Sequence, residues 1–231
     1  MASVVSTTHA ANAANPSISF TGINASAGNA VVAIISTRET GGLTLSSATW
    51  DGNTDAPDES GEPAAEEGVQ HLVYAWQGLT GTATLAITFT GTVSDIEGWC
   101  IVLSDVDTAD MIGTPSTSPG NFTSPIQATV GGDTNDIVLS AVRIRDVQAT
   151  VNVAALSGQT LLDGPQDAAN GNAIAVSSEP GDTSVTSGYT YNTGTFPEGQ
   201  ILVVNVNGTA GAGGNANLFV GKLGAPFRGK V

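Results

Sequence analysis

Apolar residues in this chain fall into short runs of strand length, each bounded by glycine, asparagine, aspartate or threonine. In the run TATLAITFTG, the odd positions from Ala83 to Phe89 are apolar, and three of the four even positions from Thr84 to Thr90 are threonine. Successive side chains of a β-strand point to opposite faces of its sheet. The run therefore predicts a strand with one buried face and one exposed face.

Three further runs are apolar on both faces: VVAIIS from Val31, WCIVLS from Trp99 and ILVVNV from Ile201. They are short and rich in β-branched residues, which disfavours a helix and is typical of central strands in a packed sandwich. No long stretch of the sequence has the i, i+3, i+4 spacing of an amphipathic helix. The pattern predicts an all-β protein.

The strand pattern of the first half returns in the second. The segment GTATLAITFTGTVSDIEGWCIVLSDVD begins at Gly81, and GDTSVTSGYTYNTGTFPEGQILVVNVNG begins at Gly181, a period of about 100 residues. Each segment has a glycine turn, a threonine-rich strand, a TGT turn, the dipeptide EG and an apolar strand. A period this long does not suit a solenoid. It predicts two β-halves of similar topology, either interleaved in one sandwich or set side by side.

We therefore predict a jelly-roll-like antiparallel β-sandwich built from two similar halves, with flexible N- and C-terminal arms. The expected parts are an N-terminal arm (1–16), the sandwich (17–207, with halves at about 17–115 and 122–207) and a glycine-rich linker with a basic C-terminal anchoring tail (208–231). Gly and Ala dominate the start of the last part, which is the composition of a linker.

Charge narrows the choice of partners. The chain has 21 acidic and six basic side chains, and three of the six lie in the last ten residues, KLGAPFRGKV. A nucleic-acid partner needs a clustered basic face, which the first 221 residues do not supply. No apolar stretch reaches the length of a membrane span, and the N-terminus lacks the pattern of a signal peptide. We expect neither a nucleic-acid partner nor a membrane.

Residues for catalysis are scarce. His9 and His71 are the only histidines; the first falls in the expected arm and the second at the start of a strand. No G-x-S-x-G sequence surrounds a serine. The only cysteine, Cys100, lies in an apolar run, so it predicts a buried thiol and no disulfide. We expect no enzyme and no cofactor.

An acidic insert follows the TWDG segment at residues 49–52 and spans residues 53–68. Its six carboxylates are interrupted by glycine and proline, with no cation among them: Asp55, Asp58, Glu59, Glu62, Glu66 and Glu67. Oxygen ligands of this kind suit Ca²⁺, although the spacing is not that of an EF-hand. The insert is either a calcium loop or a solvated projecting loop, and we expect it to be exposed and dispensable for folding.

Several segments together resemble a family. An apolar strand precedes a TWDG segment, and YAWQGLTGTATLAITFTG, WCIVLSDVDTADMIGTP and DIVLSAV follow it, with LSGQTLLDG and SVTSGYTY in the second half. This order resembles a β-sandwich domain of structural proteins of tailed bacteriophages and covers about residues 17–207. The resemblance implies a virion protein, made in the host cytoplasm, of the capsid decoration, head-fibre or tail-associated type. It implies contacts with capsid or tail subunits and a homo-oligomer on the particle.

A second function stays open. Exposed aromatic rings can stack on sugars, and Trp50, beside Asp51 and Gly52, is the tryptophan that we expect to be exposed, whereas Trp76 and Trp99 lie in apolar strands. The alternative is therefore a carbohydrate-binding adhesin that recognises a host surface glycan, with Trp50 as a contact.

The C-terminal tail combines apolar anchors with cations. Phe219 and Phe227 are interleaved with Lys222, Arg228 and Lys230. Leaving two large aromatic side chains in water is unfavourable by about 1.5 to 3 kcal/mol each, so we expect another surface to cover them. That surface is either a neighbouring subunit or shell, or the chain's own sandwich.

Overall fold

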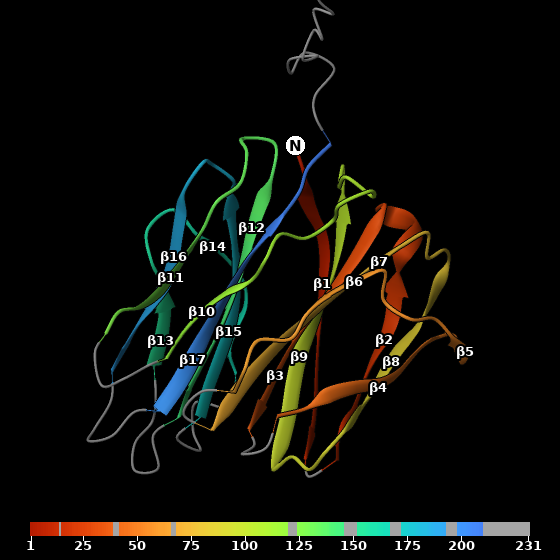
Figure 1. Ribbon diagram of the computed structural model, residues 1–231, viewed down its shortest axis with the longest axis horizontal. Helices are drawn as coiled ribbons and strands as arrows, with labels where there is room; N and C mark the ends of the chain where they lie inside the picture. Colours follow the sequence, from red (N-terminus) through yellow and green to blue (C-terminus); the bar gives the residue numbers. More distant parts are fainter. Residues whose placement is uncertain are drawn as a thin grey trace, which may run out of the picture.

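The structure is a computed structural model that describes residues 1–13, 15–38, 42–65, 68–119, 124–145, 152–166, 172–192 and 198–209. These residues form an all-β fold with a single 3-10 turn, η1 (Ala25–Ala27) (Figure 1). The prediction of an antiparallel β-sandwich fold is confirmed. Every pairing between the described strands is antiparallel.

The first half of the chain forms two packed sheets. The larger has the order β1 (Ser3–Ala13), β9 (Asp95–Ser104), β3 (Ala30–Arg38), β7 (Val69–Gln77) and β6 (Glu59–Gly61). The smaller has the order β2 (Ser17–Asn24), β8 (Thr82–Thr90), β4 (Thr44–Trp50) and β5 (Asn53–Thr54). The predicted alternating strand is β8, which buries Leu85, Ile87 and Phe89 against the larger sheet.

The second half repeats this arrangement. Its larger sheet has the order β10 (Ser116–Pro119), β17 (Glu198–Val206), β12 (Ile137–Arg145), β15 (Asn172–Pro180) and β14 (Thr160–Gln166). Its smaller sheet has the order β11 (Ile126–Val130), β16 (Val185–Asn192) and β13 (Asn152–Ala155). Strand for strand, β9 corresponds to β17, β3 to β12 and β7 to β15, so the repeat in the sequence is a repeat of topology.

The two halves lie side by side, with their five-stranded sheets face to face (Figure 1). We call the apolar layer between these sheets the seam; it contains Ile34 and Ile101 from the first half and Leu139 and Leu202 from the second. Each large sheet is thus covered on both faces. This explains the runs that are apolar at every position: in β3, Val32 and Ile34 face the seam, while Val31, Ala33 and Ile35 face the smaller sheet.

The central contact between the halves has the symmetry of a twofold interface, whereas the outer contacts do not. Across the seam β3 packs on β12, β7 on β17 and β1 on β14. Exchanging each strand for its counterpart in the other half maps the β3–β12 contact onto itself. An isologous interface has this property, because the same patch is used on both sides.

The repeated dipeptide EG marks a close approach of strands. A Cβ atom on Gly98 would lie 2.7 Å from the carbonyl oxygen of Ile34, and one on Gly199 would lie 2.4 Å from the carbonyl oxygen of Arg143. In each half an isoleucine side chain also fills the space, Ile35 or Ile144. Only glycine lets these central strands approach so closely.

The expected N-terminal arm is wrong for Ser3–Ala13, because these residues form β1 at the edge of the first large sheet. Pairing with β9 extends from Ser3 opposite Ser104 to Ala13 opposite Asp95. Ala2 and Val4 also pack against the seam. Long-range backbone pairing and apolar burial therefore order a segment whose local sequence resembles a linker. The predicted linker and tail lie, from residue 210 onward, outside the described residues.

The two halves should unfold together, because the seam is a shared core. All three tryptophans belong to the first half, but Trp99 packs in the seam, so the experiment uses a Trp99→Phe background in which Trp50 and Trp76 report on the first half alone. Leu139→Ala, in the second half and fully buried in the seam, should lower the unfolding free energy by about 2–5 kcal/mol. The tryptophan-detected midpoint in urea should fall with it.

Leu161→Ala is the matched control, since Leu161 is 45 % exposed. An unchanged tryptophan transition in Leu139→Ala, with an earlier transition by circular dichroism, would show that the halves unfold independently.

Candidate functional site

The basic side chains of the described residues gather at one end of the seam. Arg38 is the last residue of β3, and Arg143 and Arg145 end β12 beside it. His71 in β7 and His9 in β1 face the same layer, since His71 interacts with Gln200 of β17 and His9 with Glu97 of β9. We call residues 1–209 the body. In its described part the cationic side chains lie near the seam, and the other charged side chains are acidic.

Arg143 is the centre of this cluster and its side chain is fully buried. Nε donates a hydrogen bond to Asn172 Oδ1 at 3.1 Å, and Nη1 donates to the carbonyl oxygen of Ser36 at 3.3 Å. Nη2 donates to Asp95 Oδ1 and lies 3.6 Å from Glu97 Oε1. Except for Asn172, these partners belong to the first half, so the arginine ties one large sheet to the other.

Two effects oppose each other at this guanidinium. Burial lowers the pKa of Arg143, while the carboxylates of Asp95 and Glu97 raise it in part. A buried cation costs several kcal/mol unless it is paired and hydrogen-bonded. Here two carboxylates and two further acceptors surround it, so the cation is compensated only when the two halves are stacked in this register.

His71 is buried beside the cluster. Its backbone N–H and its Nδ1–H both donate to Gln200 Oε1, at 3.0 and 3.1 Å, and Gln200 Nε2 donates to the carbonyl oxygen of Ala64 at 3.1 Å. Burial, helped by nearby Arg143, lowers the pKa of His71 from 6.5 to about 4, although the Gln200 hydrogen bond opposes the shift. His71 is therefore neutral at pH 7.

His9 lies on strand β1 and not on a free arm. Its Nε2 is 3.5 Å from Glu97 Oε2, and its ring is tilted against Trp99 with centroids 5.9 Å apart. Trp99 Nε1 donates to Asp163 Oδ2 at 3.0 Å, across the seam. Within the described residues, neither histidine hydrogen-bonds a serine, threonine or cysteine side chain, so the geometry shows no paired nucleophile and base.

The acidic insert is partly built into the fold, so the expectation of an exposed projecting loop is wrong for its central part. Glu59 accepts hydrogen bonds from the backbone N–H groups of Met111 (2.8 Å) and Ile112 (2.7 Å). Glu62 accepts a hydrogen bond from the hydroxyl of buried Tyr74 at 2.7 Å. Among the described residues, no group of three or more His, Cys, Asp or Glu side chains is arranged to hold a metal ion.

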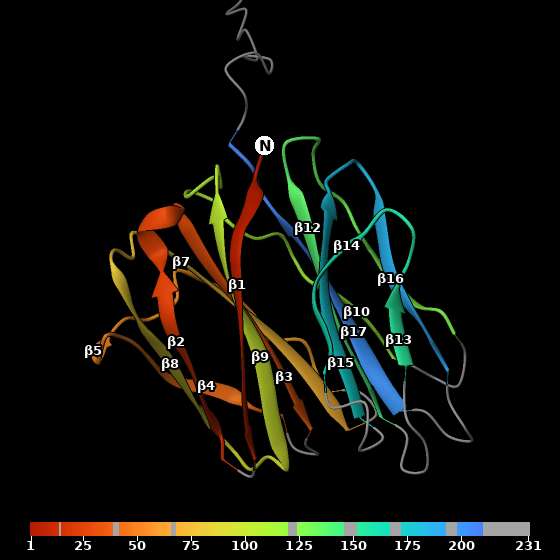
Figure 2. The ribbon, with the colours of Figure 1, turned by 180° about the vertical axis from the view of Figure 1, so that it is seen from behind.

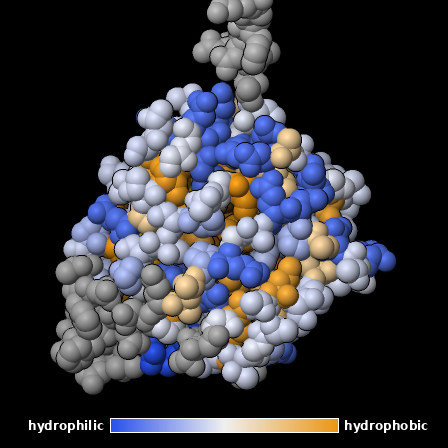
Figure 3. Space-filling view, in the orientation of Figure 1, coloured by the Kyte–Doolittle hydropathy of each residue, from blue (hydrophilic) through white to orange (hydrophobic). Residues whose placement is uncertain are grey.

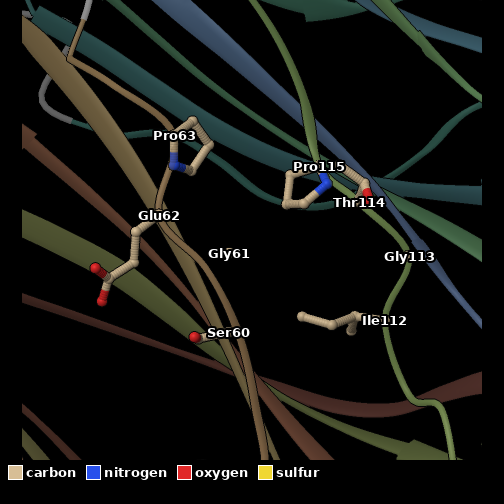
Figure 4. Close-up of a pocket in the computed structure, with 8 residues that line it drawn as sticks. All are labelled: Ser60, Gly61, Glu62, Pro63, Ile112, Gly113, Thr114 and Pro115. Atoms are coloured by element: carbon tan, nitrogen blue, oxygen red, sulfur yellow. The ribbon is translucent and has the colours of Figure 1, made fainter.

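A groove lies where the insert meets the segment before β10 (Figure 4). It is lined by Ser60–Pro63 and Ile112–Pro115 and has a volume of about 380 Å³. Figure 4 shows Pro63 and Pro115 on opposite walls and the Glu62 carboxylate pointing away from Pro115. Because its carboxylate is hydrogen-bonded by Tyr74, Glu62 offers little ligand-binding capacity to this groove, and the other lining residues are uncharged.

A second groove lies on the opposite border of the seam, between β1 and β14. One wall is Met1–Val4, the other contains Thr160 and Leu162, and Glu179 lies among its lining residues. Its volume is also about 380 Å³. We call it the N-terminal groove, and Figure 2 shows the two strands that border it side by side.

Trp50, the predicted glycan contact, is half-buried at the end of β4 and packs against the core of the first half. Its Nε1 donates to the carbonyl oxygen of Thr80 at 3.1 Å. Trp76 and Trp99 are fully buried, as predicted, and so is Tyr74. These rings do not join Trp50 in a surface platform, and the role of Trp50 in glycan binding stays a prediction.

The predicted anchoring residues lie outside the described residues: Phe219, Lys222, Phe227, Arg228 and Lys230. The sequence does not predict the ion cluster, because it shows only that the first 221 residues contain few cations and not which strands face each other. One signal was present: Arg143 interrupts IVLSAVRI, a run that is otherwise apolar or small. A charged residue on a strand covered on both faces requires a partner inside the protein.

Comparison with known proteins identifies no family for this chain. No family model matches the chain, and no curated protein matches it. A solved structure of a conserved protein of unknown function from Pseudomonas aeruginosa aligns over 88 % of this chain and 82 % of its own, with 16 % identity and a TM-score of 0.32. At that TM-score the likeness supports no argument. In the described part of the chain, no helix has the length and apolar character needed to cross a membrane.

Arg143→Met should lower the unfolding free energy by about 3–5 kcal/mol, because it leaves the carboxylates of Asp95 and Glu97 without their buried cation. Urea denaturation at pH 7 measures the loss. Adding Asp95→Asn and Glu97→Gln to the same chain should recover part of it, since the remaining groups are then neutral.

Arg38→Met, at the partly exposed end of the neighbouring strand, is the control for this change. If Arg143→Met cost no more than Arg38→Met, the cluster would not hold the halves together.

Stability should fall as the pH decreases from about 6.5 to 4, in part through His71. Its pKa of about 4 lies below its ordinary value of 6.5. In this range the unfolded chain binds the proton and the folded chain does not, so protonation favours unfolding. The contribution approaches about 3 kcal/mol at the low end of the range. The unfolding free energy of His71→Met should therefore decrease less over the same range, and parallel curves would contradict the assignment.

Proposed function

We propose that this chain is a structural protein of a viral particle, of the capsid decoration or head-fibre type, and that its basic C-terminal tail holds it there. The observation that carries the proposal is the separation of charge. Residues 1–209 contain all 21 acidic side chains and three arginines, a formal charge of −18, while the remaining residues contain three cations and no acid.

In the structure, the separation of charge leaves the surface of the body acidic. The three arginines of the body lie at the end of the seam, and Arg143 is fully buried there. Copies of such a body repel one another at neutral pH. A tail that carries Lys222, Arg228 and Lys230 together with two phenylalanines can attach an acidic body to an acidic neighbour. The resemblance to structural proteins of tailed bacteriophages supports the same role.

The proposal is tested on particles assembled with a chain that ends at Gly214. All described residues are retained, so the sandwich should stay folded, as circular dichroism checks. Mass spectrometry of purified particles should show the full chain and little of the shortened one. Normal incorporation of the shortened chain would rule out attachment through the tail.

A chain with Lys222→Gln, Arg228→Gln and Lys230→Gln is the matched control for charge. It keeps both phenylalanines, so it should attach more weakly than the natural chain and lose its sensitivity to salt. Saturable binding of isolated polysaccharides that Trp50→Ala abolishes would instead favour the adhesin.

A further inference from the structure

The N-terminal groove is bordered by apolar side chains that water contacts. Among the described residues, three large apolar side chains are exposed: Met1 (60 %), Val5 (42 %) and Leu161 (45 %). Met1 lines the groove, Val5 belongs to β1 and Leu161 to β14, the two strands that border it. Exposed apolar residues of this size thus occur at the N-terminus and on the two border strands, beside the lining residues Val4 and Leu162.

The backbone at this border is also available. β1 and β14 are the outer strands of their sheets, and in the described part of the chain each is paired on one side alone. Natural edge strands are protected by charges or proline. The eleven residues of β1, SVVSTTHAANA, contain no aspartate, glutamate, lysine, arginine or proline. This edge therefore lacks the features that would keep another segment from pairing with it.

The groove itself combines an apolar floor with a carboxylate. Val4, Ile137 and Leu162 supply apolar atoms, and Glu179 lies near the end of β15 at the border of the groove, with its carboxylate hydrogen-bonded by Ser187 of β16. Burial raises the pKa of Glu179, although a hydrogen bond from Ser187 opposes the shift. A cation placed nearby would stabilise the ionised carboxylate. An apolar segment with a flanking lysine or arginine fits these features.

We propose that the N-terminal groove is the docking site of the chain's own C-terminal segment, Asn217–Leu223, with Phe219 in the groove and Lys222 near Glu179. The inference deepens the proposed function, because it names where the tail binds. Asn217–Leu223, NLFVGKL, has three consecutive apolar residues and one cation. Its charge is opposite to that of the body.

The point at which the described chain ends supports this occupant. Gly208 lies beside the N-terminus, since a Cβ atom on it would be 3.0 Å from Ala2 N, and Ala2 lines the groove. The nine residues from Thr209 to Asn217 span up to about 30 Å when extended. The segment can therefore reach the groove of its own chain, and the same segment of a second copy presents the same chemistry.

Binding of a labelled peptide, Asn217–Val231, to the chain that ends at Gly214 tests the proposal. Fluorescence anisotropy should show saturable binding. Thr160→Arg places a cation on an exposed wall residue of the groove and should weaken binding at least tenfold, as should Phe219→Ala in the peptide. Thr88→Arg, an exposed threonine on the smaller sheet of the first half, adds the same charge away from the groove and should change little.

Circular dichroism first confirms that both variants remain folded. No binding, or equal binding to Thr160→Arg and Thr88→Arg, would overturn the proposal. Self-association of the shortened chain that Thr160→Arg prevents would also overturn it, because the body of a second copy would then occupy the groove.

The full chain separates this inference from the proposed function. Concentration-dependent assembly in sedimentation experiments, prevented by Thr160→Arg, would support both. A monomer that does not bind added peptide until truncation after Gly214 removes the tail would support the groove and count against a tail that links copies.

Discussion

The burial of the Arg143 guanidinium between two sheets is the constraint on which the arrangement of the halves depends. Apolar surfaces attract without direction, so the seam alone would permit the large sheets to shift against each other. A buried cation permits much less, because it must stay with Asp95, Glu97 and the carbonyl oxygen of Ser36. These partners lie on the opposite sheet. The fold adopts the register in which each nitrogen of the guanidinium has a hydrogen-bond or charged partner.

The same constraint shapes the outer surface. Placing the arginines of the body at the seam leaves its many carboxylates without cationic neighbours over most of the surface. A body of this kind is soluble in itself and repels its own copies. Any attachment to an acidic partner must then come from outside the body, and the three cations among the last ten residues are the ones that remain. The arginines of the body are thus used at the seam, and the tail carries the cations that can contact an acidic partner.

Local pattern predicted the strands well, because alternation and two-sided apolar runs report which faces are covered. The run around Ile34 is apolar on both faces because two different sheets cover it, and the repeat of EG reports the close approach at Gly98 and Gly199. Contacts between distant residues were not predictable in this way. The segment Ser3–Ala13 becomes a strand only by pairing with β9, and Glu59 becomes structural only through the N–H groups of Met111 and Ile112. The ion cluster required knowing which strands face each other, which the repeat left open.

The two borders of the seam are closed differently, and this difference bears on the tail. Exchange of the halves maps β6 and β10, on one border, onto β14 and β1 on the other. On the first border the Glu59 carboxylate holds the segment before β10, and proline rings line the groove in between. On the second border the described residues provide no such segment, and Met1, Val5 and Leu161 remain exposed. A stack built from two similar halves thus has one covered border and one open border. The open border begins beside Gly208, one residue before the end of the described chain. A C-terminal segment that is apolar and basic is the part of this chain whose chemistry matches the open border.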